Sequence, residues 1–121
     1  MARILAVDDQ LVMRELVKQV LENAGHEVFL ADNPQPAMEI AKVESLDLII
    51  TDINMPGGSG LNLVDALRKE SNTQFTPILM MTTETAEHKK DRARKNGASG
   101  WLGKPFDPPR LLAAVQKLTS S

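Results

Sequence analysis

Short apolar runs alternate along the chain with longer stretches in which apolar residues recur every three or four positions. The short runs predict strands at residues 3–7, 27–31, 48–51, 77–81 and 101–103. The longer stretches predict helices at 11–24, 61–69, 87–96 and 108–118. A further helix is predicted to open at 33–36, because proline is tolerated in a first turn. Five successive βα units predict an α/β fold: a doubly wound, five-stranded parallel sheet. The flavodoxin-like strand order 2-1-3-4-5 is one of two common orders, and periodicity alone does not select it.

The predicted elements differ in how clearly they show a buried side. Residues 48–51 are continuously apolar, as expected of a parallel strand covered on both faces. The first helix is expected to carry Val12, Leu16 and Val20 on one apolar face, with Met13, Val17 and Leu21 beside it. The 87–96 helix has few and small apolar residues among its charges and should pack weakly. Residues 55–60 (MPGGSG) predict a loop.

Composition narrows the class of protein. A chain of 121 residues, 42% hydrophobic and 25% charged, is expected to form one globular domain over residues 1–121, without an output domain. A net charge of −2 does not favour nucleic-acid binding. The absence of cysteine excludes disulfides and thiolate metal sites and fits a cytoplasmic location. No apolar run is long enough to span a bilayer. We expect the protein to be a monomer.

Charged residues follow three of the predicted strands directly. Asp8 and Asp9 come after the first strand, Asp52 after the third and Lys104 after the fifth. Because open α/β sheets place their ligand site at the carboxyl ends of the strands, we expect these four side chains to meet. Two carboxylates about 4 Å apart repel by roughly 4 kcal/mol at an effective dielectric of 20, so the cluster calls for a cation.

Asp52 is the candidate nucleophile in this cluster, since a carboxylate can accept a phosphoryl group. The transferring charge is usually neutralised by Mg²⁺ and a lysine. Asp8, Asp9, Asp52 and the backbone carbonyl of Asn54 offer the hard oxygen ligands that Mg²⁺ prefers. Thr82 ends the fourth predicted strand, and its hydroxyl could donate to a phosphoryl oxygen.

Five motifs appear in an order that is highly specific when taken together: VDD at 7–9, DINMP at 52–56, TTE at 82–84, GASGW at 97–101 and KPF at 104–106. With these motifs the chain resembles response-regulator receiver domains over almost its full length. Among them it is most similar to stand-alone chemotaxis regulators of the CheY type.

The resemblance implies a role for each matching residue. Asp52 would be the phosphoacceptor, Lys104 would contact the phosphoryl group, and the Lys104–Pro105 bond would be cis. Asp9 and the Asn54 carbonyl would bind Mg²⁺ directly, with Asp8 acting partly through water. Thr82 and Trp101 would form the switch pair. Asn54 and Glu84 would tune how fast the phosphoryl group is gained and lost.

The resemblance also implies partners and an output surface. The donor would be a phosphohistidine on a histidine kinase, and the target would be a protein such as the flagellar motor switch. The target would bind the surface formed by residues 87–96, the fifth strand and the last helix. The chain would catalyse only its own phosphorylation and dephosphorylation and would not otherwise be an enzyme.

Simpler interpretations remain for single residues. The Asp8-Asp9 pair could start a turn or cap the first helix, Lys104 could be a solvated charge, and Thr82 could be only a good β-former. Trp101 could be a packing aromatic. The charges at 88–95 predict a solvated helix face rather than a nucleic-acid patch, and His26 and His88 are expected at the surface.

Other functions compete with the motor-binding switch. The same pocket would serve a phosphate sink or a phosphorelay intermediate. A Mg²⁺-dependent aspartyl-phosphate phosphatase needs a second carboxylate two residues after its nucleophile, where this chain has Asn54. A flavin-binding protein of similar fold needs a first loop that accepts phosphate, and Asp8-Asp9 would repel it.

Overall fold

The computed structural model describes residues 1–55, 58–82 and 97–120 and contains a five-stranded parallel sheet. Its strands are β1 (Arg3–Val7), β2 (Glu27–Ala31), β3 (Leu48–Asp52), β6 (Ile78–Thr82) and β7 (Gly100–Gly103). Their order is β2-β1-β3-β6-β7, and every neighbouring pair is parallel. Because β6 and β7 are the fourth and fifth predicted strands, the flavodoxin-like order 2-1-3-4-5 is confirmed.

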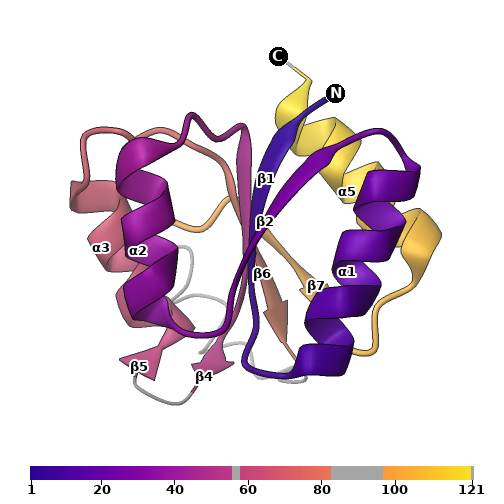
Figure 1. Cartoon of the computed structure of the whole chain (residues 1–121), viewed down its shortest axis with the longest axis horizontal. Helices are drawn as coiled ribbons and strands as arrows, with labels where there is room; N and C mark the ends of the chain where they lie inside the picture. The colour runs from indigo at the N-terminus through magenta and orange to yellow at the C-terminus, as the bar shows by residue number, and fades with distance from the viewer. Residues whose placement is uncertain (56–57, 83–96, 121) are drawn as a thin grey trace.

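Helices cover both faces of this sheet (Figure 1). On one face lie α1 (Leu11–Asn23) and α5 (Pro108–Thr119), and on the other α2 (Pro34–Val43) and α3 (Gly60–Lys69). The predicted helix at 87–96 falls outside the described residues. No helix in the described ranges combines the length and apolar character needed to cross a bilayer.

The local sequence explains where α2 begins and where α1 ends. The Asn33 side chain accepts a hydrogen bond from the Gln35 N–H at 3.0 Å, and Pro34 occupies the first position of α2, where its missing N–H costs nothing. After α1, Gly25 adopts a φ of +92°, a left-handed conformation that glycine reaches at little cost. The chain can therefore turn directly into β2.

The sheet separates two apolar clusters, one beneath each pair of helices. On α1, Val17 and Leu21 are buried, whereas Val12 and Leu16 are exposed. Of the two neighbouring apolar rows on this helix, the structure thus buries the one that contains Val17 and Leu21. Every residue of β3 is buried, as its continuous apolar pattern predicted.

The expectation of a simple loop at residues 55–60 is wrong for the part that the structure describes. Asn54–Met55 (β4) and Gly58–Ser59 (β5) form a two-stranded antiparallel sheet, and α3 begins at Gly60. Strands of two residues are too short to show an alternating pattern. These two short strands lie between β3 and α3 in the chain, shortly after Asp52.

Candidate functional site

Three strand ends bring the predicted site residues together. Asp8 and Asp9 follow β1, Asp52 is the last residue of β3, and Lys104 follows β7. Strands β1 and β3 are neighbours, and they lie where the connection order of the sheet reverses. In open α/β sheets the ligand crevice forms outside the carboxyl ends of the strands at this reversal.

Lys104 joins two of the carboxylates directly. Its Nζ lies 2.6 Å from Asp8 Oδ2 and 2.9 Å from Asp52 Oδ2. The three side chains expose only 7%, 8% and 10% of their surface for Lys104, Asp8 and Asp52, respectively. The interpretation of Lys104 as a solvated charge is therefore wrong, since charges this buried need partners.

Asp9 completes an acidic cluster that could hold a metal ion. Oxygen atoms of Asp8, Asp9 and Asp52 all lie within 4.8 Å of one another. Three carboxylates and the single ammonium of Lys104 carry a formal charge of −2. Hard oxygen donors with an excess of negative charge suit a hard divalent cation. Asp9 is exposed, so this side of the cluster is open to solvent.

Asp8 is fixed from three directions. Its Oδ1 accepts the Gln10 N–H at 2.9 Å, and its backbone carbonyl accepts Arg14 Nη1 at 2.8 Å. Its own N–H donates to the Ala31 carbonyl at 3.1 Å, which extends the pairing of β1 with β2. The bond to Gln10 starts the turn before α1, whose N-cap residue, Gln10, has no side-chain cap bond, so the interpretation of Asp8 as a helix cap is wrong. Asp8 also presents Oδ2 to Lys104.

The electrostatics of the cluster keep Lys104 charged. Burial by itself lowers the pKa of the Lys104 amine, but the hydrogen bonds to Asp8 and Asp52 and the charges of both carboxylates outweigh burial. The pKa of Lys104 is consequently raised above its usual value. The ammonium form thus remains available to stabilise negative charge at neutral pH.

The remaining predicted residues lie around this cluster to different extents. Thr82 ends β6, and its backbone pairs with Gly103, the residue before Lys104. Asn54 opens β4, two residues beyond Asp52. Trp101 lies within β7, half-buried against the apolar cluster beneath α2 and α3. Glu84 falls outside the described residues.

The loop after β7 has the predicted geometry. The Lys104–Pro105 peptide bond is cis. This loop borders a hollow of about 340 Å³ beside the cluster. The hollow is lined by Leu102, Gly103, Lys104, Pro105, Asp107 and Arg110.

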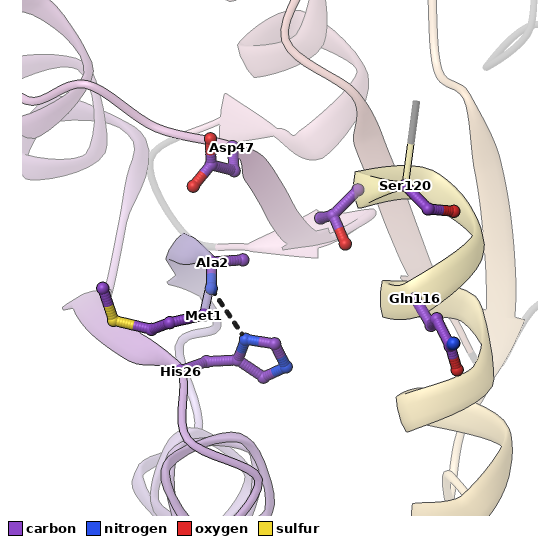
Figure 2. Close-up of a pocket in the computed structure, with 7 residues that line it drawn as sticks. Met1, Ala2, His26, Asp47, Gln116 and Ser120 are labelled. Carbon is purple, nitrogen blue, oxygen red and sulfur yellow. Dashed lines mark hydrogen bonds between the residues drawn. The ribbon is translucent and has the colours of Figure 1, made fainter.

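A second hollow, of about 290 Å³, lies at the opposite end of the sheet (Figure 2). The Nδ1 of His26 accepts the Ala2 N–H at 3.0 Å, and Asp47 Oδ2 accepts the Arg3 N–H at 2.8 Å. Burial and the nearby amino terminus lower the pKa of His26. His26 is thus half-buried and bonded to the backbone, rather than the simple surface residue expected from the sequence.

Comparison with known proteins identifies the family of this chain. The family model of the response regulator receiver domain matches residues 4–116. The chain belongs to this family. It is therefore the receiver domain of a two-component response regulator.

Three relatives show which kinds of receiver domain this chain is similar to. The structure of the chemotaxis response regulator CheY4 of Vibrio cholerae matches with a TM-score of 0.93 and 45% identity over 98% of both chains. The protein PilH of Pseudomonas aeruginosa is 35% identical over 95% of both chains. The phosphate regulon regulator PhoB of the same species is 36% identical over 93% of this chain, which spans about half (49%) of PhoB's length.

The sequence did not predict the hydrogen bonds that Arg14, His26 and Arg68 of this receiver domain form. Arg14 contacts the carbonyl of Asp8, His26 contacts Ala2, and Arg68 contacts Gly97. Arg14 and Arg68 lie on amphipathic helices, where a basic residue ordinarily indicates solvent exposure. Only the spacing of Arg14 from Asp8, on the first turns of α1, carried a local signal.

Proposed function

We propose that the chain is a phosphorylation-activated signalling switch in which Asp52 accepts a phosphoryl group from a phosphohistidine of a histidine kinase. The supporting observation is the close approach of Asp52 to two further carboxylates and one ammonium group. Transfer breaks the P–N bond of the donor and forms a P–O bond to a carboxylate oxygen of Asp52. The released imidazole takes up a proton from solvent.

Each residue of the cluster has a separate task in this transfer. Lys104, already 2.9 Å from Asp52 Oδ2, exchanges this contact for one with a phosphoryl oxygen as charge moves outward. The Thr82 hydroxyl donates to another phosphoryl oxygen. Asp8, Asp9, Asp52 and the Asn54 carbonyl would hold Mg²⁺, which when bound neutralises charge on the carboxylates and the transferring group.

The output follows from the new charge. Phosphorylation adds about −1.5 to −2 charges and strong acceptor oxygens at Asp52. Thr82 moves toward them and Trp101 turns inward, which changes the proposed target-binding surface on β7 and α5. Asn54 and Glu84 tune the rates at which the phosphoryl group is gained and lost.

We infer a chemotaxis pathway, with the flagellar motor switch as the target. The inference is supported by 45% identity to a protein described as a chemotaxis response regulator. Retention on immobilised motor switch protein should increase when Mg²⁺ and beryllium fluoride, which mimic the acyl phosphate, are added. Retention that is absent in both states would favour the role of phosphate sink or phosphorelay intermediate.

The chain is not a turnover phosphatase in this proposal. Phosphatases that form an aspartyl phosphate need a general acid to protonate the leaving group, and Asn54 stands where that carboxylate would be. The purified protein should therefore leave p-nitrophenyl phosphate unhydrolysed.

A pair of variants tests the phosphoacceptor. Acetyl phosphate with Mg²⁺ should label the wild-type protein with an acid-labile, hydroxylamine-sensitive phosphoryl group, and Asp52→Asn should abolish this label. Asp47→Asn is the matched control, because Asp47 directly precedes the same strand that Asp52 ends. Label that persists in Asp52→Asn would assign the reaction to another residue, whereas loss in both variants would indicate general damage.

A further inference from the structure

Arg68, in the last turn of α3, makes a set of contacts that its sequence position does not suggest. Its Nε and Nη2 donate to the Gly97 carbonyl at 3.1 and 2.8 Å. Its Nη1 donates to carbonyls of the turn that leads into β6, at 3.0 Å for Thr73 and 2.6 Å for Thr76. Among the described residues, all of its hydrogen-bond acceptors are backbone carbonyls.

Gly97 is shaped to receive this side chain. It adopts a φ of +105°, which side-chain-bearing residues rarely reach. A Cβ at this position would lie 2.9 Å from Arg68 Nε and 3.0 Å from Arg68 Cγ. Both the backbone conformation and the close approach of the guanidinium therefore require glycine.

Ser99 fixes the same segment to β6. Its N–H donates to the Ile78 carbonyl at 2.7 Å, and its Oγ accepts the Ile78 N–H at 3.0 Å. The segment 97–99 is thus held by Arg68 on one side and by Ile78 on the other. Strand β7 starts at the next residue and carries Trp101, and Lys104 follows it directly.

We propose that Arg68 is a positioning residue that fixes the start of β7, and through it the placement of Trp101 relative to the core. The planar guanidinium reaches the Gly97 and Thr76 carbonyls simultaneously, so it joins the end of α3, the turn before β6 and the entry to β7. When phosphorylation turns the Trp101 ring inward, the backbone at the start of β7 would then keep its position. This last consequence rests on the proposed function, whereas the positioning itself does not.

Amide hydrogen exchange of Arg68→Met, without Mg²⁺ or phosphodonor, tests the positioning. Protection of the Ser99 and Trp101 amides should fall at least about tenfold further than that of the β1 amides. The fluorescence of Trp101, the single tryptophan, should shift to longer wavelength. An equal loss across the whole sheet, or no loss at residues 97–101, would overturn the proposal, because Arg68 would then contribute only general stability or nothing.

Two further variants separate geometry from charge and folding. Arg68→Lys should behave like Arg68→Met, because one ammonium cannot replace the fork that bridges two carbonyls, and full rescue by lysine would overturn the proposal. Gly97→Ala should give the same local signature from the other partner and serves if Arg68→Met does not fold. Lys69→Met is the control, since the Lys69 side chain is 78% exposed and forms an ion pair with Asp65.

The final arm adds Mg²⁺ and beryllium fluoride. In the wild type the Trp101 signal should change, and in Arg68→Met the change should be smaller, because the ring starts from a less defined position. If the wild type shows no change, the proposed switch fails while the exchange result still decides the role of Arg68. A full-sized change in Arg68→Met, together with lost protection at Ser99, would remove the link between positioning and switching.

Discussion

The two ends of β3 carry the same residue type in opposite electrostatic settings. Asp47, at the amino end, accepts the Arg3 N–H, and its own N–H donates to the Arg3 carbonyl at 2.7 Å. Asp52, at the carboxyl end, shares one lysine with Asp8 and has Asp9 nearby. The Asp47 carboxylate is hydrogen-bonded to the backbone and so maintains the fold. At the other end the carboxylates outnumber the ammonium group, so this end can bind a cation.

The largest expected effect comes from removing Lys104, which joins two carboxylates of the crowded end. Lys104→Met should lower the free energy of unfolding by about 3 kcal/mol, because two buried carboxylates lose the ammonium group that they share. Mg²⁺ should restore more stability to this variant than to the wild type, since the ion no longer competes with Lys104 for the same oxygens. Urea unfolding with and without Mg²⁺, at matched ionic strength, measures both quantities.

Equal effects of Mg²⁺ on the wild type and on Lys104→Met would contradict a shared site. Lys69→Met provides the baseline for losing a lysine. Its exposed pairing with Asp65 at 3.2 Å should contribute less than about 1 kcal/mol.

A smaller effect is expected at the matched end. Asp47→Ala should cost about 1 kcal/mol, the typical net value of one hydrogen bond, because the Arg3 N–H loses its acceptor. Asp47→Asn keeps an acceptor oxygen and should cost less. Thermal or urea unfolding should give the same loss with and without Mg²⁺, and a Mg²⁺-dependent difference would mean that the two ends are not independent.

The smallest effect is a pH dependence at His26. The folded state lowers the pKa of His26, so the unfolded chain binds more protons once the pH falls below the ordinary histidine value of about 6.5. The wild type should therefore lose stability relative to His26→Gln as the pH falls from about 6.5 through the lower pKa of the folded state. Urea unfolding of both proteins at pH 7 and pH 5 measures this effect. A difference in the free energy of unfolding between the two proteins that is the same at both pH values would contradict the linkage.

The sequence predicted the acid cluster because its geometry follows from topology alone. Asp8, Asp52 and Lys104 each follow a strand, and parallel strands bring their carboxyl ends to one edge. By contrast, the choice between Val12 with Leu16 and Val17 with Leu21 depended on how α1 rotates against the sheet. Both rows are apolar, so periodicity held no answer.

Contacts between side chains and distant backbone groups were beyond the sequence for another reason. Arg68 could be interpreted only as a cation near a helix carboxyl end, where basic residues are generally favourable. Its true acceptors lie in the turn at 73–76 and at Gly97, 29 residues away. Such a contact requires the relative placement of α3 and β7, which no local pattern specifies.

The location of the chain ends has a practical consequence. Met1 and Ser120 line the same hollow. The chain ends lie at the opposite end of the sheet from the carboxyl ends of the strands (Figure 1). An affinity tag joined at either terminus would anchor the molecule to a sensor chip with its acidic rim turned toward the flowing solution. Injected donor proteins could then reach Asp52 without obstruction from the chip surface.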